Sequence, residues 1–263
     1  MLSVAARARL TVVLVGARNP SNIGAAARAM QDFGFSDLRI VNDYSAPFEA
    51  AQLEDAATPK SAVGAASVMQ RAQRFSSLAE AIADCSLVAG TTAIGDRDLQ
   101  RDILTLQEVA PQILRPLAGE VGSPRPRVAL LFGSEKTGLS KEHLSHCSLL
   151  LTIPLFAPED ARHLSMNLGQ SVAVCLYELT REGLEGSREI PTLHEAAATA
   201  DDRERLTQLL LDVMHVTDYT RRFPANASEP LVRQLTLQLG TSHREAMTWM
   251  GILRQILWRE RKQ

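Results

Sequence analysis

The stretch Leu10–Val41, LTVVLVGARNPSNIGAAARAMQDFGFSDLRIV, contains the pattern from which the fold follows. Its first part, Leu10–Gly16, is apolar and β-branched, which is typical of a strand buried on both faces. A segment with helical spacing follows, and we expect Asn22 to cap its start and Gly34 its end. Leu38–Val41 is the next strand. Strand, helix and strand in this order predict a parallel βαβ unit with a right-handed crossover.

The same alternation continues along the chain to residue 181. Further strands are predicted at Ser86–Thr91, Val128–Gly133 and Leu149–Ile153. Further helices are predicted at Ala62–Ala72, Leu78–Asp84, Leu104–Leu117 (interrupted by Pro111), Lys141–Cys147 and Asn167–Arg181. Strands that alternate with helices predict an α/β fold, in which a parallel sheet carries helices on both faces.

The pattern changes near Gly183. The segment Gly183–Pro191 contains Gly, Ser and Pro and is typical of a linker. Beyond it no strand is predicted, and helices are expected at residues 195–222, 229–239 and 242–262. Thr241 or Ser242 can cap the last helix, and Glu245 stands at the capping-box position relative to Ser242. We therefore divide the chain into an α/β domain, residues 1–185, and a small all-helical C-terminal extension, residues 186–263.

Composition limits the class of protein. With 45% hydrophobic and 22% charged residues among 263, the chain can bury a core of normal size without metals or disulfides. A net charge of -2 argues against nucleic-acid binding through bulk charge, but it allows a local basic face. The cysteines Cys85, Cys147 and Cys175 lack zinc spacing, so we expect reduced thiols. We also expect a cytoplasmic protein with no metal, no signal peptide and no membrane span.

Three polar segments each follow a predicted strand: Asn19–Arg28, Leu131–Leu139 and Ile153–Leu168. Open α/β sheets bind ligands at the carboxyl ends of their strands, so all three are candidate binding loops. None contains the dinucleotide pattern G-x-G-x-x-G or the phosphate-loop pattern G-x-x-x-x-G-K. Taken singly, each can be explained as a capped helix or a tight turn.

Taken in order, the three segments resemble the motifs of SpoU-type RNA 2′-O-ribose methyltransferases, within the SPOUT superfamily. Motif one matches at Asn22, Gly24 and Arg28, motif two at Phe132–Glu135 with Gly138-Leu139, and motif three at Ile153-Pro154 and Ser165–Asn167. The resemblance extends from residue 10 to about 182. The runs RNPSNIGAAARAM, GTT and GILRQILW are most similar to the TrmJ branch, which methylates tRNA at nucleotide 32 of the anticodon loop.

The resemblance implies a trefoil knot at the C-terminal end of the α/β domain, a homodimer, and S-adenosylmethionine as the methyl donor. The cofactor contacts that it implies are Thr91, Thr92, Ala93, Gly133, Ile153, Leu164, Ser165 and Met166. The catalytic residues that it implies are Arg28, Asn22, Ser165, Asn167 and Glu135. The substrate would be RNA, with cytidine or uridine 32 of tRNA expected.

In this family the arginine of motif one, which corresponds to Arg28, is described as the base of the reaction. A guanidinium, however, stays protonated in proteins. Our hypothesis is that Arg28 grips a phosphate and stabilises negative charge that develops on the ribose oxygen. Ser165 and Asn167 would orient Arg28 and the ribose. Asn22 would hold its loop, and Glu135 would fix the motif-two loop or a basic partner.

Other functions remain open at this point. The same chemistry could act on ribosomal RNA, or the chain could be a catalytically silent RNA-binding protein on the same fold. For the C-terminal helices, which carry several arginines with Trp249 and Trp258, two interpretations compete. The helices either form a solvated bundle that only packs, or they add phosphate contacts to RNA.

Overall fold

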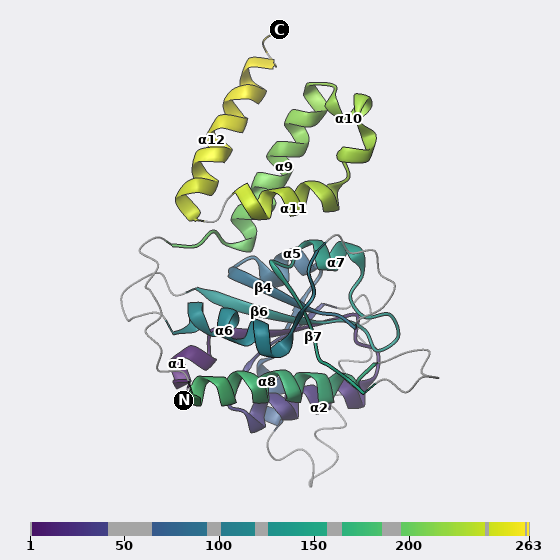
Figure 1. The fold of residues 1–263 in the computed structure, drawn as a ribbon, viewed down its shortest axis with the longest axis vertical. Helices are drawn as coiled ribbons and strands as arrows, with labels where there is room; N and C mark the ends of the chain where they lie inside the picture. The colour runs from purple at the N-terminus through teal and green to yellow at the C-terminus, as the bar shows by residue number, and fades with distance from the viewer. Residues whose placement is uncertain are drawn as a thin grey trace.

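The computed structural model describes residues 2–41, 65–93, 101–118, 126–156, 165–185, 196–239, 242–260 and 262. Figure 1 shows a central sheet with helices on both of its faces. A group of C-terminal helices lies above one of these helical layers, at the top of the view.

The sheet is parallel throughout the described residues. Its strands are β1 (Leu10–Val15), β2 (Asp37–Val41), β3 (Gln73–Phe75), β4 (Cys85–Thr91), β5 (Leu104–Thr105), β6 (Arg127–Phe132) and β7 (Leu149–Thr152). Their order is β3-β2-β1-β6-β4-β7-β5. All neighbouring pairs are parallel, which confirms the predicted sheet. The sequence pattern did not indicate β3 or β5, because such short edge strands are defined by pairing rather than by alternation.

Alternate residues of the central strands point into two separate cores. Val12 and Leu14 of β1 belong to a core that α2, α6 and α8 cover. Val13 and Val15 belong to the opposite core, covered by α5 and α7. The helices of this domain are α1 (Val4–Arg7), α2 (Pro20–Asp32), α4 (Ala66–Arg71), α5 (Leu78–Ile82), α6 (Leu106–Leu117), α7 (Lys141–Ser145) and α8 (Leu168–Glu185).

The start of α2 differs from the prediction. Asn19, not Asn22, caps the helix, and its side chain accepts a hydrogen bond from the Ser21 N–H at 3.0 Å. Pro20 then takes the first helical position, where its fixed φ and missing N–H cost nothing. Gly34 follows the capping residue Phe33 with φ of +75°, so the prediction for the helix end was correct to within one residue. Asn22 is thereby available for contacts outside its helix.

Two further helices differ from the prediction. α6 is continuous through Pro111. Proline has no N–H, so one carbonyl of the preceding turn lacks its helical hydrogen bond. Pro111 lies on the exposed side of α6, where water can bind that carbonyl instead. α8 extends to Glu185, so the linker cannot begin at Gly183. The segment 186–195 lies outside the described residues, as does 157–164, which is part of the path that a trefoil knot would involve. The knot and the division at residue 185 therefore stay predictions.

The C-terminal part contains α9 (Ala200–Val216), α10 (Tyr219–Arg222), the 3-10 helix η1 (Pro224–Asn226), α11 (Glu229–Leu239) and α12 (His243–Glu260). The helix expected over 195–222 is broken at Asp218, which has φ of +63°. α12 and α11 both pack against α9. α9 and α12 share a small core that includes Leu206 and Met250. The predicted capping box is confirmed, since Ser242 and Glu245 bond each other's backbone N–H at 3.2 and 3.0 Å.

Among the described residues, no helix is long and apolar enough to cross a membrane. Within the same residues, no group of His, Cys, Asp and Glu side chains could hold a metal ion. Cys85, Cys147 and Cys175 are buried and form no disulfide. Burial raises the pKa of the Cys147 and Cys175 thiols to about 12, so both stay protonated at neutral pH.

Candidate active site

Three of the expected cofactor segments lie at one edge of the sheet. β4 lies between β6 and β7. Thr91 ends β4, Gly133 follows β6 and Ile153 follows β7, so these positions are at the carboxyl ends of three adjacent parallel strands. Such an edge is where open α/β sheets bind their ligands. Leu164, which completes the expected set, lies outside the described residues.

Hydrogen bonds fix the backbone at this edge. The Thr91 hydroxyl donates to the Leu131 carbonyl at 2.9 Å, and the Thr92 N–H donates to the Leu151 carbonyl at 2.9 Å. The strand ends are therefore tied to one another by Thr91 and Thr92, whereas Ala93 is exposed. Small and uncharged residues of this kind leave backbone groups to bind a ligand, which fits a nucleoside-like cofactor held without charged side chains.

The motif-two turn is closed too tightly for any residue but glycine at position 133. A Cβ added to Gly133 would lie 2.0 Å from the Gly138 carbonyl carbon and 2.2 Å from the Leu139 nitrogen. Gly138 has φ of +65°, and its N–H bonds the Ser134 carbonyl at 2.8 Å. The two glycines thus bring the ends of the loop together and hold Glu135 between them.

Glu135 binds the motif-one loop. Its carboxylate accepts hydrogen bonds from the Arg18 and Asn19 N–H groups, both at 3.2 Å, and from Asn22 Nδ2 at 2.9 Å. Partial burial acts to raise the pKa of this carboxyl, but the hydrogen bonds outweigh it, so the pKa is lowered. Glu135 is therefore ionised at neutral pH and holds two chain segments 116 residues apart.

Asn22 extends this connection to motif three. Its Oδ1 accepts a hydrogen bond from Asn167 Nδ2 at 2.8 Å. The Oδ1 of Asn167 accepts from the Gly169 and Gln170 N–H groups at 2.9 and 3.4 Å, which places Asn167 as the cap of α8. Glu135, Asn22 and Asn167 form a continuous chain of hydrogen bonds, which we call the three-motif relay.

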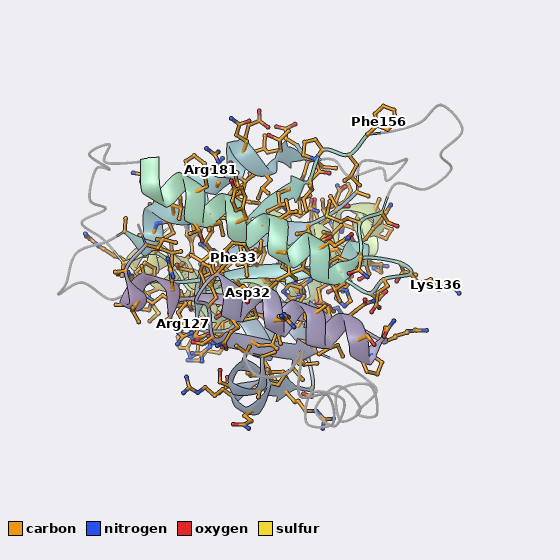
Figure 2. All side chains as sticks on the ribbon, turned by 90° about the horizontal axis from the view of Figure 1, so that it is seen from below. Asp32, Phe33, Arg127, Lys136, Phe156 and Arg181 are labelled. Atoms are coloured by element: carbon orange, nitrogen blue, oxygen red, sulfur yellow. The ribbon has the colours of Figure 1, made fainter. Side chains whose placement is uncertain are left out.

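The helices that start at this relay lie side by side (Figure 2). A Cβ on Gly169 would lie 2.5 Å from the Ala25 Cβ, so Gly169 and Ala25 allow the close approach of α8 to α2. At the other end of α2, Phe33 contacts Tyr177 of α8 edge-to-face, with ring centroids 6.2 Å apart. Packing along the pair therefore fixes the geometry of the relay.

The remaining expected residues lie around the relay but outside it. Arg28 is exposed on α2, six residues after Asn22, which corresponds to about 9 Å along the helix axis. Ser165 is exposed and Met166 half-buried, directly before Asn167. The structure thus brings Asn22, Glu135 and Asn167 into contact, and leaves exposed side chains at Arg28, in the second half of α2, and at Ser165, just before α8.

Some residues of the site were not found from the sequence. The Arg18 and Asn19 N–H groups that bind Glu135 carry no side-chain signal, and Ala25 and Gly169 are ordinary small helical residues. The one usable signal was the run Gly24–Ala27, whose small side chains indicate close packing of the helix against a neighbour.

Comparison with known proteins identifies relatives over most of the chain. Residues 9–177 match the SpoU rRNA Methylase family. The chain is 32% identical, over 94% of its length and 89% of the relative, to a Sodalis glossinidius protein named tRNA (cytidine/uridine-2′-O-)-methyltransferase TrmJ. It is 34% identical to a Pseudomonas aeruginosa protein named tRNA (cytidine/uridine/adenosine-2′-O-)-methyltransferase TrmJ, over 78% of each chain.

A solved structure is similar over nearly the whole chain. The crystal structure of TrmJ from Z. mobilis ZM4 superimposes with a TM-score of 0.73 at 28% identity. The superposition covers 94% of this chain and 98% of that one. The similarity thus includes the C-terminal helices as well as the α/β part.

Proposed function

The chain belongs to the SpoU rRNA methylase family and is thus an RNA methyltransferase; from this premise we propose that it is a tRNA 2′-O-ribose methyltransferase that uses S-adenosylmethionine. The observation that carries the proposal is the three-motif relay. It joins the loops after β1, β6 and β7 at one edge of the sheet, through side chains more than 100 residues apart. The named relatives that match most of the chain act on tRNA.

The strand-end segments would hold the cofactor. Thr91, Thr92 and Ala93 after β4, Gly133 after β6 and Ile153 after β7 would present mainly backbone groups, joined by Leu164, Ser165 and Met166. When bound, S-adenosylmethionine supplies a methyl group attached to a positively charged sulfonium sulfur. This sulfur is a good leaving group. In the transfer, the ribose 2′-oxygen would form a bond to the methyl carbon, and the sulfur would leave as a neutral thioether with the electron pair of the broken carbon–sulfur bond.

The protein's task is to align the 2′-hydroxyl and to stabilise the charge that develops on its oxygen. Arg28, exposed on α2, would bind the adjacent phosphate and the developing oxyanion through its planar fork of donors. The 2′-hydroxyl proton would pass to a phosphate oxygen or to water. Ser165 would contact the ribose. Both polar atoms of Asn167 are engaged by the protein itself, so its proposed role changes from orienting the ribose to positioning the site.

The finer substrate is also part of the proposal. By the TrmJ resemblance, we propose nucleotide 32 of the tRNA anticodon loop, with cytidine or uridine as the base. The two named relatives differ in whether adenosine is included, so base selection varies among close relatives. We further propose a homodimer, in which basic surfaces of two subunits combine and offset the net charge of -2, and a cytoplasmic location, where tRNA is modified.

The test is ribose-methylation mapping at nucleotide resolution. The purified protein is incubated with S-adenosylmethionine and unmodified tRNA transcripts, and in parallel with ribosomal RNA. The proposal expects one methylated ribose, at position 32, and none in ribosomal RNA. Methylation of ribosomal RNA alone would contradict the proposed substrate but would leave the proposed reaction standing. Cofactor binding without methylation of either RNA would favour the catalytically silent alternative.

A deletion strain provides the second arm of the test. Loss of a single tRNA ribose methylation in that strain, restored by the wild-type chain but not by an Arg28→Ala variant, would assign the activity in the cell. Sedimentation of the purified protein tests the dimer separately, because it needs neither cofactor nor RNA.

A further inference from the structure

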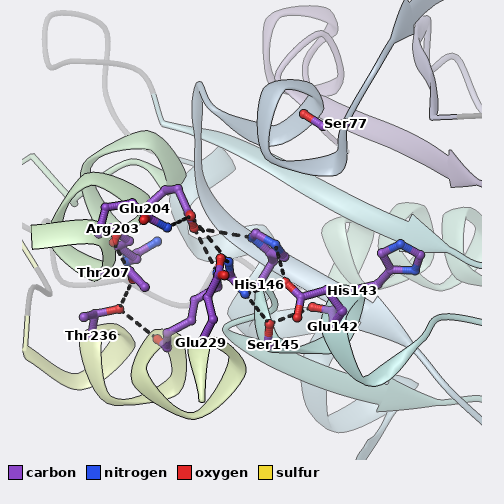
Figure 3. A network of polar contacts seen from close by, with 12 residues as sticks. Ser77, Glu142, His143, Ser145, His146, Arg203, Glu204, Thr207, Glu229 and Thr236 are labelled. Carbon is purple, nitrogen blue, oxygen red and sulfur yellow. Dashed lines mark hydrogen bonds and ion pairs between the residues drawn. The ribbon is translucent and has the colours of Figure 1, made fainter. Parts of the chain in front are cut away.

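A buried guanidinium of α11 joins the C-terminal helices to the α/β part, in addition to Arg203 of α9, which donates to the Ser86 carbonyl of β4 at 2.9 Å. Arg233 of α11 is only 4% exposed. Its Nε lies 2.9 Å from Glu204 of α9, and its Nη1 lies 2.7 Å from Glu142 and 2.9 Å from the Ser145 hydroxyl, both on α7. Its Nη2 bonds Glu229 of α11. Figure 3 shows Glu142, Ser145, Glu204 and Glu229 gathered at this junction.

The charges at this junction favour one arrangement. Arg233 is the guanidinium that the three carboxylates share, and its own pKa is raised because the carboxylates outweigh the effect of its burial. Burial and the nearby Arg233 lower the pKa of His146 to about 4, so this neighbour is neutral at pH 7 and adds no competing positive charge. A buried arginine with such partners keeps its geometry, because any displacement leaves charged groups unpaired.

The opposite side of α7 reaches the proposed cofactor edge. A Cβ on Gly90 would lie 2.6 Å from Cys147 Sγ and 3.3 Å from Leu144 Cδ2. Gly90 directly precedes Thr91 and Thr92. Immediately after α7, the Ser148 N–H donates to the Val88 carbonyl at 2.8 Å. α7 and the residues that follow it are therefore packed against the end of β4.

Two other segments are attached to α7 or to the residues just after it. The motif-two turn leads directly into α7, which Ser140 caps through the His143 N–H at 3.1 Å. Arg101, eight residues beyond Ala93, donates to the Cys147 and Ser148 carbonyls at 2.7 and 2.8 Å. α7 is thus in contact with the C-terminal helices on one side and with the chain around the β4 and β6 loops on the other.

We infer that Arg233 is a positioning residue for the cofactor edge of the sheet, and that it acts through α7. By holding α7 between α9 and α11, it sets the positions of Thr91, Thr92 and the motif-two turn. The C-terminal helices are then a structural part of the cofactor site and not only an attachment for RNA. The cofactor part of this inference rests on the proposed function; the coupling through α7 does not.

The test compares two carboxylates that share the same arginine. Glu142→Gln weakens the ion pair that connects Arg233 to α7, whereas Glu229→Gln weakens a pair within α11. The two side chains are similarly exposed, at 50% and 48%, so Glu229→Gln is a matched control. Hydrogen exchange of backbone amides is measured on the full-length chain, together with S-adenosylmethionine affinity by calorimetry.

The inference expects Glu142→Gln to speed exchange in residues 88–93 and 131–139 and to weaken S-adenosylmethionine binding about five-fold or more, the usual size of a coupling between sites. Glu229→Gln should leave both measurements unchanged. A purely structural anchor would give faster exchange in α9–α12 alone and unchanged cofactor affinity, and that result overturns the inference.

Two features keep the outcome clear. Should Glu142→Gln fail to fold, Ser145→Ala removes the hydrogen bond from Arg233 to α7, together with the bond from the Ser145 hydroxyl to the Glu142 carbonyl, and is expected to give the same pattern. Should the wild-type chain bind no S-adenosylmethionine, the proposed function fails, while the exchange pattern still decides whether α7 couples the two parts.

Discussion

The Asn167 side chain donates a hydrogen bond to the Asn22 side chain at 2.8 Å, across 145 residues of sequence. Both residues stand where a helix begins, but only Asn167 caps its own helix. The Nδ2 of Asn22 donates a hydrogen bond to the Glu135 carboxylate. A network of amides and one ionised carboxylate therefore determines how three loops of the proposed active site are placed.

Replacing Asn22 with Asp tests this relay. The change removes the Nδ2 donor and places a second carboxylate beside Glu135, so we expect turnover to fall by about ten-fold or more as the loops shift. Methyl transfer to tRNA is measured under single-turnover conditions. Gln170→Ala, an exposed change at the start of α8 beside Asn167, serves as the control. Equal turnover in all three proteins would show that the relay has no role in positioning.

The close contact of α2 and α8 predicts opposite effects for two glycines. Gly169→Ala places a Cβ 2.5 Å from the Ala25 Cβ and should destabilise the fold by about 1–3 kcal/mol. Gly24→Ala, also inside a helix, meets no atom within 4 Å and should stabilise it by up to about 1 kcal/mol. Urea unfolding of the two variants measures the difference. If both changes shift the urea midpoint in the same direction, the result contradicts the close contact between α2 and α8.

Arg28 should be sensitive to the shape of its side chain as well as to its charge. Arg28→Lys keeps the charge but loses the planar fork, so we expect turnover to fall by about two orders of magnitude. S-adenosylmethionine affinity should change little, since Arg28 lies on α2, away from the strand ends. A lysine variant with nearly full turnover would remove Arg28 from its proposed role.

Stability should fall in mild acid because of His146. An unfolded histidine binds a proton near pH 6.5, whereas burial lowers the pKa of His146 to about 4 in the folded protein. Between these values the unfolded state binds more protons, so stability decreases as pH falls, with a slope of up to about 1.4 kcal/mol per pH unit. His146→Gln should flatten the curve between pH 6.5 and 4, whereas a change at the exposed His215 should not. An unchanged slope in His146→Gln would contradict the burial of this group.

The two interpretations of the C-terminal helices differ in their dependence on salt. Arg254 and Arg259 are exposed on α12, near Trp258, whose ring lies 3.8 Å from the Lys262 ammonium. If this surface binds phosphates, changing both arginines to Gln should reduce the slope of log K against log salt by about 0.7–0.9 for each phosphate that is no longer neutralised. Thermal stability should not change, because both side chains are exposed. Identical salt slopes for variant and wild type would leave packing as the role of this surface.

The alternation of strands and helices up to residue 181 was predictable from the sequence, and the structure confirms it. Apolar runs such as Leu10–Val15 and the small residues of α2 are local signals, because burial on a strand or along one helix face imposes its period on neighbouring residues. The capping box at Ser242 was predictable for the same reason, since its two members are three residues apart.

Only the tertiary structure determined which polar residues meet. Asn22 appeared to be a cap because its neighbours fit a helix start, but the cap is Asn19, and Asn22 contacts chain segments 113 and 145 residues away. Arg233 is likewise one of several arginines in the C-terminal helices, and only the structure shows that it is buried beside α7. Spacing along the chain encodes contacts within one element. Contacts between elements depend on how the sheet brings distant strand ends together, and no local pattern records them.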